Sequence, residues 1–217
     1  MIYVESNEQE FFRIYGKISS AVKPRIYVGV LGGITQHFYL AKHAQTVILI
    51  DRNIVQIEYL YKYREGSCNF IRSFIDSLPP IEKIYTRVSD LAYTVCIKYG
   101  KRILSLLEKS IILHGDIFKI PIQMADLIYI SNVLDYYLST EVPHQINVAL
   151  IIDRIFELLE RSQIVVLTNM FSSSYLSYLN AALQLSDPYY VYRRCGSSCL
   201  YVVSKKPLRI KGLNSYH

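Results

Sequence analysis

The chain has 217 residues, of which 51% are hydrophobic and 19% charged, so it can bury enough apolar surface to fold as one domain and is not expected to be disordered. No apolar run approaches the roughly 18 residues that a membrane-spanning helix needs, and acidic residues among the first fifteen argue against a secretory signal peptide. Lysine and arginine number 24 against 18 acidic residues, and the resulting charge of +6 fits an anionic ligand, a membrane surface or nucleic acid without selecting one.

Strands and helices are predicted to alternate along most of the chain. An amphipathic helix is predicted over 7–21 and is ended by Pro24. Buried apolar runs predict five strands, at 25–33, 46–51, 111–117, 125–131 and 163–170. Helical patterns lie between these strands, at 35–44 (with Thr35 as a candidate N-cap), 54–65, 145–161 and 172–185.

The stretch between about 59 and 110 is longer than an ordinary crossover between strands. It keeps a helical pattern on both sides of Pro79-Pro80, so we interpret it as a helical insertion. With the N-terminal segment 1–24 as a helical cover and 25–207 as a Rossmann-like core, the whole chain 1–217 is expected to form a single domain.

Two β-rich runs at 189–195 and 199–205 flank Gly196-Ser197-Ser198, which is a hairpin signal. The fold class is therefore α/β, a doubly wound and mostly parallel sheet that ends in an antiparallel hairpin. Cys195 and Cys199 should face one another across the hairpin turn. With no export signal, the four cysteines are expected to be reduced thiols and the protein cytoplasmic.

Candidate site residues follow the carboxyl ends of the predicted strands, where open parallel sheets bind ligands. The first strand ends in Gly29-Val30-Leu31-Gly32-Gly33, a turn whose glycines allow a ligand close to the backbone, or which is simply tight. Asp51 ends the second strand, 18 residues after Gly33, and a carboxylate there can accept both hydroxyls of a ribose. Asp51 could equally cap the helix that starts after Asn53, and the two roles are compatible.

The next two strands also end in polar residues. Asp116 can accept from an exocyclic amine while Ile117 packs on a purine face, and Ser131-Asn132 can line the centre where a substrate is held. None of the five histidines forms a pair at zinc spacing, so no metal site is predicted.

Together these features resemble the class I S-adenosylmethionine-dependent methyltransferases, over roughly 25–206. The resemblance implies that Gly29, Leu31 and Gly33 form the glycine loop, that Asp51 binds ribose and Asp116 adenine, and that Ser131-Asn132 line the methionine or substrate end. Two positions depart from the family pattern, because Tyr27 replaces its usual acidic residue and Leu31 its middle glycine. The Asp/Asn-Pro-Pro-aromatic signature of amine methyltransferases is also absent, which argues against methylation of a nucleobase or amide nitrogen.

A narrower stretch, Asp51-Arg52-Asn53-Ile54-Val55-Gln56, is similar to enzymes of the betaine-lipid synthase type, which transfer the 3-amino-3-carboxypropyl arm of the same cofactor. Ser131-Asn132 and Asp135-Tyr136 add to that similarity. Arg52 and Gln56 are therefore included with Gly32 among the expected cofactor-binding residues. Asp135, Tyr136 and His114 are the candidates for orienting or deprotonating an acceptor.

The resulting prediction is an S-adenosylmethionine-dependent transferase, with methyl transfer to a small-molecule or lipid-like acceptor first and aminocarboxypropyl transfer or cyclisation second. A non-catalytic Rossmann binding module is the remaining alternative, because Tyr27 and Leu31 break the motif. A nicotinamide-dependent dehydrogenase is disfavoured, because Gly-x-Gly-x-x-Gly is not present. Nucleic acid is not indicated, the basic C-terminal tail is compatible with peripheral membrane contact, and the oligomeric state is left open.

Overall fold

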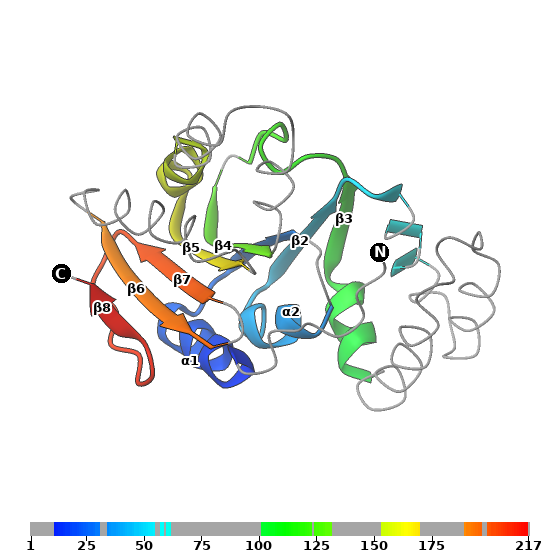
Figure 1. The fold of residues 1–217 in the computed structure, drawn as a ribbon. Helices are drawn as coiled ribbons and strands as arrows, with labels where there is room; N and C mark the ends of the chain where they lie inside the picture. The colour runs from blue at the N-terminus through cyan, green and yellow to red at the C-terminus, as the bar shows by residue number, and fades with distance from the viewer. Residues whose placement is uncertain are drawn as a thin grey trace.

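The part of the chain that the structure describes is built on one eight-stranded mixed sheet (Figure 1). The computed structural model describes residues 11–30, 34–54, 57–58, 60–61, 101–122, 124–131, 153–169, 189–196 and 199–216. The strands in chain order are β1 (Ile26–Val30), β2 (Thr46–Asp51), β3 (Ser110–His114), β4 (Ala125–Ser131), β5 (Ser162–Asn169), β6 (Tyr190–Cys195), β7 (Cys199–Ser204) and β8 (Asn214–Tyr216). Their order across the sheet is β3-β2-β1-β4-β5-β7-β6-β8.

The first five strands of this sheet are parallel and the last three are antiparallel to their neighbours. The chain moves outward from β1 through β2 to β3, then returns to place β4 on the other side of β1. The switch point of the sheet therefore lies between β1 and β4. This arrangement confirms the predicted doubly wound, mostly parallel sheet with an antiparallel hairpin at its end.

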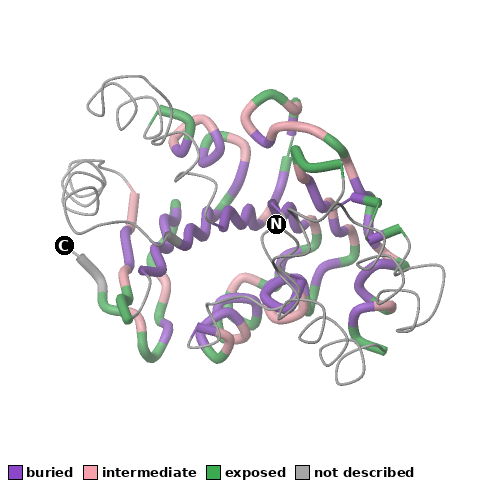
Figure 2. Tube along the Cα trace, turned by 45° about the vertical axis from the view of Figure 1, so that its right-hand side comes forward, coloured by how far each residue is buried: buried purple, intermediate pink, exposed green. Residues whose placement is uncertain are grey.

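Helices cover both faces of the sheet, as its fully buried central strands require. Helices α1 (Phe12–Val22) and α2 (Ile34–Leu40) share one apolar cluster with the helical residues 101–108 and with side chains such as Tyr27, Leu49 and Tyr129. The helical residues 153–160 pack on the opposite face against Val28, Ile128 and Val165. Figure 2 shows the buried residues concentrated along the central strands between these two layers.

Polar contacts fix the ends of several elements. Helix α1 ends at Lys23, whose backbone is left-handed (φ 47°) and whose N–H donates to the Ser19 carbonyl at 2.8 Å. The Lys109 ammonium donates to the carbonyls of Ala41 (3.3 Å) and Ala44 (3.0 Å), just beyond the end of α2. These contacts satisfy groups that helix termini otherwise leave without partners.

At the amino edge of the sheet, Asp126 joins β4 to the start of β1. One carboxylate oxygen accepts the backbone N–H groups of Arg25 (2.8 Å) and Ile26 (2.9 Å), and the other accepts the side-chain amide of Gln163 at 3.0 Å. This edge is the one opposite the predicted site, so Asp126 has a structural role.

Four predictions need correction. Strand β3 ends at His114, because Gly115 and the turn at 117–119 leave the ladder before Ile117. Thr35 lies inside α2 and does not cap it. The tail forms the additional strand β8, paired with β6. Cys195 and Cys199 form a disulfide and are not free thiols.

Other predictions fall outside the described residues, namely the helix at 172–185 and the part of the insertion at 62–100. In the described part of the chain, no helix has the length and apolar character needed to span a bilayer.

Candidate functional site

The carboxyl ends of the five parallel strands meet along one edge of the sheet. Residue pairing places Asp51 of β2 opposite His114 of β3, Val30 of β1 opposite Ile50, and Ser131 of β4 opposite Thr168 of β5. The pairs at the ends of β2–β3 and of β4–β5 therefore place polar residues side by side at this edge. Ligands of open α/β sheets bind beyond this edge, near the switch between β1 and β4.

Asp51 is the half-buried carboxylate at this edge. Its Oδ1 accepts the backbone N–H of Asn53 at 2.7 Å, so the capping role considered from the sequence is present. Burial raises the pKa of Asp51 from its ordinary 3.8 to about 6, although the N–H groups of Asn53 and Arg52 oppose that rise. A carboxylate with a raised pKa lacks enough donors to compensate for lost water, so further hydroxyl or N–H donors would stabilise its ionised form.

Three other predicted residues surround Asp51. His114 is exposed, and its Nε2 lies 3.0 Å from the Arg52 carbonyl oxygen. The Arg52 guanidinium lies 3.9 Å from the Asp116 carboxylate, with the arginine side chain 61% exposed. The backbone N–H of Gly115 donates to the Asp51 carbonyl at 2.8 Å. The ends of β2 and β3 thus bring these polar residues together.

Asp116 and Ile117 have structural contacts of their own. The Asp116 carboxylate accepts the backbone N–H of Phe118 at 3.0 Å and holds the turn that follows β3. Ile117 is buried in the apolar cluster on the face of the sheet that the helical residues 153–160 cover, together with Val30 and Ile130.

Gly29 lies beneath a buried aromatic pair. The Tyr27 hydroxyl lies 2.6 Å from Nδ1 of His37, a residue of α2. A Cβ added at Gly29 would come within 2.5 Å of that nitrogen and within 2.8 Å of the Tyr27 oxygen. The pair therefore fills the space over Gly29, and close packing of these side chains is what requires a glycine there.

This aromatic pair is uncharged. Burial lowers the pKa of His37 to about 3, so its ring is neutral at physiological pH. The ring also contacts Tyr129 of β4 edge-on, and the Tyr129 hydroxyl lies 3.1 Å from Thr168 Oγ1. Next to His37, both polar atoms of the Gln36 side chain and His37 Nε2 are buried, and they find no hydrogen-bond partner among the described residues.

Sequence reasoning missed this polar cluster of Tyr27, His37, Tyr129 and Thr168. In the sequence, Tyr27 stands out only because it replaces the family's acidic residue. The feature that could have indicated the cluster is His37, ten residues later in the helix that follows the glycine turn. Several expected site residues lie outside the described residues and are not placed: Leu31, Gly32, Gly33, Gln56, Asn132, Asp135 and Tyr136.

Away from this edge, a hollow of about 590 Å³ is bounded by Tyr190, Tyr192 and the segment 207–213. It lies beside β6 at the far end of the sheet, so it does not belong to the candidate site. Within the described ranges no cluster of three histidine, cysteine or acidic side chains is arranged to hold a metal ion.

Comparison with solved structures finds chains of similar fold. WbdD matches 98% of this chain and 44% of its own, with a TM-score of 0.52 and 10% identity. The fold is that of the class I methyltransferases. NodS, an N-methyltransferase from Bradyrhizobium japonicum WM9 crystallised with S-adenosyl-L-homocysteine, has a TM-score of 0.49 and 12% identity over 93% of this chain and 88% of its own.

An rRNA methylase from Escherichia coli has a TM-score of 0.48 and 12% identity over 91% of this chain. This chain spans 64% of the length of that protein, as it spans less than half of WbdD. No protein-family model matches the sequence, and no curated protein matches it significantly. At identities this low the structural likeness concerns the fold alone and assigns no acceptor.

Proposed function

We propose that this protein is an S-adenosylmethionine-dependent transferase, and first of all a methyltransferase, acting on a small-molecule or lipid-like acceptor. The observation that carries the proposal is the half-buried carboxyl of Asp51. It ends the strand next to β1 in a sheet of class I methyltransferase order.

The residues at the ends of β2 and β3 fit the ribose of such a cofactor. The two vicinal hydroxyls of a ribose are the kind of donors that a desolvated carboxylate lacks, and each charge-assisted bond contributes about 1.5–3 kcal/mol. Asp51 would accept those hydroxyls, while its bond from Asn53 keeps the side chain oriented. Arg52 is held beside it by Asp116 and the His114 ring.

The first glycine of the turn does not fit a role in contacting the cofactor, because Tyr27 and His37 occupy the space over Gly29. Tyr27 also stands where the family has an acid. The buried polar atoms of Gln36 and His37 have no partner within the described residues.

S-adenosylmethionine supplies a sulfonium, whose positive charge makes the attached carbons electrophilic. The protein's contribution is then mainly to align donor and acceptor, so a dedicated base is not required. His114 is exposed at the same edge and is our candidate among the described residues for taking a proton from the acceptor. The fourth strand continues as Ser131-Asn132-Val133-Leu134, which supports an acceptor other than a nucleobase amine.

The test is calorimetric titration of the whole chain with S-adenosylmethionine and S-adenosylhomocysteine. Asp51→Ala should weaken binding tenfold or more, since charge-assisted hydrogen bonds to the ribose are lost. Asp153→Ala removes an exposed carboxylate from the helical residues on the far face and is the matched control. Binding that is equal in wild type and Asp51→Ala would refute the ribose assignment, and no heat at millimolar ligand would favour a binding module.

The by-product identifies the reaction once binding is established. S-adenosylhomocysteine released in the presence of candidate acceptors indicates methyl transfer. Methylthioadenosine indicates transfer or cyclisation of the aminocarboxypropyl arm and would refute methyl transfer.

A further inference from the structure

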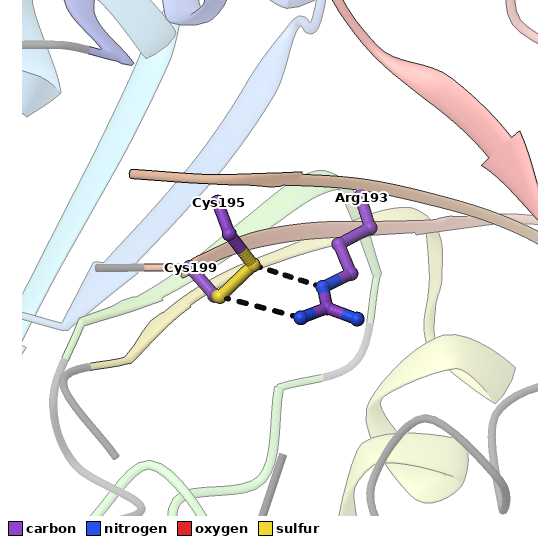
Figure 3. The surroundings of a disulfide bond; sticks show 3 residues. All are labelled: Arg193, Cys195 and Cys199. Atoms are coloured by element: carbon purple, nitrogen blue, oxygen red, sulfur yellow. Dashed lines mark hydrogen bonds between the residues drawn. A yellow bond between two sulfur atoms is a disulfide. The ribbon is translucent and has the colours of Figure 1, made fainter. Parts of the chain in front are cut away.

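The hairpin of β6 and β7 places two cysteines and an arginine on one face. Cys195 and Cys199 are register partners at the end of the hairpin, with Cα atoms 4.1 Å apart, and their sulfurs are joined. Two residues along the ladder, Arg193 is paired with Tyr201. Side chains two apart on a strand share a face, so the arginine lies directly beside the disulfide (Figure 3).

The Arg193 guanidinium spans both sulfur atoms. Its Nε donates to Cys195 Sγ at 2.9 Å, and its Nη2 lies 3.8 Å from Cys199 Sγ. The group is also held over the Tyr201 ring, with Cζ 5.8 Å from the ring centroid. A cation fixed next to a sulfur atom stabilises the thiolate over the thiol, and it is not needed to hold a disulfide together.

The two sulfurs differ in access to solvent. Cys195 is exposed on the outer strand of the hairpin, whereas Cys199 is 5% exposed and packs in the apolar cluster on that face. Cys199 also pairs with Asn169 at the carboxyl end of β5. A reagent from solution therefore reaches Cys195 first, at the same edge of the sheet as the candidate site.

We propose that Cys195 and Cys199 form a reversible thiol–disulfide exchange site for low-molecular-weight thiols, with Arg193 as the group that stabilises the thiolates. A small thiolate attacks Cys195 Sγ, the Cys195–Cys199 bond breaks, and Cys199 leaves as a thiolate. A second small thiolate attacks the sulfur of its own kind in the mixed disulfide and releases the Cys195 thiolate. One small-molecule disulfide is formed, two electrons enter the protein, and each cysteine can then take up a proton.

Each of these steps leaves negative charge on a sulfur that Arg193 faces. The arginine should therefore favour the dithiol form and speed the reaction of Cys195. This site does not depend on the proposed transferase activity.

The experiment equilibrates the folded protein in buffers of varied reduced-to-oxidised glutathione ratio at a fixed pH, followed by acid quenching and alkylation. Trypsin cleaves after Arg194 and Lys205, so one peptide carries both cysteines and its mass reports the redox state separately from Cys68 and Cys96. Wild type should pass from disulfide to dithiol within the accessible range. Arg193→Met should require at least a fivefold higher ratio of reduced to oxidised glutathione for half reduction.

Arg194→Met is the matched control, because Arg194 is the neighbouring exposed arginine and donates to the Gly212 carbonyl, away from the sulfurs. It should stay within twofold of wild type, and Arg193→Lys should fall between wild type and Arg193→Met. The alkylation rate of Cys195 in the reduced protein should drop at least fivefold in Arg193→Met alone. Equal midpoints for the two methionine variants, or a wild type that remains wholly disulfide or wholly dithiol throughout, would overturn the proposal.

Discussion

Replacing Asp51 by Asn should make the ligand-free protein more stable at neutral pH. The folded carboxyl keeps its proton up to about pH 6, whereas in the unfolded chain it loses the proton near its ordinary pKa of 3.8. The folded state therefore binds more protons between these values, and wild-type stability falls as the pH rises through that window. At 1.36 kcal/mol for each pKa unit, ionising Asp51 in the folded state costs ~3 kcal/mol. Because solvent screens this half-buried carboxyl, we expect a stability difference of about 2–3 kcal/mol.

The assay is urea unfolding of wild type and Asp51→Asn at several pH values from 4 to 8. The difference in unfolding free energy should move by about 2–3 kcal/mol in favour of the variant as the pH rises from 4 to 7. His37 has the opposite dependence, because its lowered pKa removes stability as the pH falls from 6.5 toward 3, and taking the difference between the two proteins cancels that contribution. A difference that does not change with pH would show that Asp51 is not desolvated.

Three further outcomes follow from the same geometry. Affinity for S-adenosylhomocysteine should fall as the pH is lowered through 6, by up to about tenfold for each pH unit, because ribose hydroxyls bind the ionised Asp51. A calorimetric affinity that stays the same from pH 8 to 5 would contradict this prediction. Gly29→Ala should lower the unfolding free energy by about 1–3 kcal/mol, since the added methyl would meet His37. The same change should cost at least ~1 kcal/mol less in a His37→Ala background, and additive effects would disprove the contact. Tyr27→Phe should destabilise the fold by about 1–3 kcal/mol in urea unfolding by leaving His37 Nδ1 without its partner, and a neutral result would count against that bond.

The sequence predicted the elements that a buried parallel sheet specifies most strongly. The runs that became β2 and β4 are almost wholly apolar and end on a polar residue, so their bounds were predicted without error. The tail strand β8 was missed because Asn214–Tyr216 has no alternating apolar pattern and depends on β6 for its conformation.

The site was predictable to the extent that topology alone determines it. Asp51 and His114 end adjacent parallel strands, so their proximity follows from strand order. The Tyr27–His37 bond could not be predicted, because it depends on how α2 is rotated against the sheet. Likewise, the facing of Cys195 and Cys199 followed from the hairpin register, but their oxidation did not.

The position of α1 affects the order in which the protein can fold. Its Tyr15 packs edge-on against Tyr129 of β4, and its Lys17 ammonium donates to the Lys211 carbonyl at 2.7 Å, 194 residues further along the chain. During synthesis this helix emerges before the strands on which it packs, so it must wait for partners that lie later in the chain. Its amphipathic face therefore stays exposed to solvent until the sheet is made.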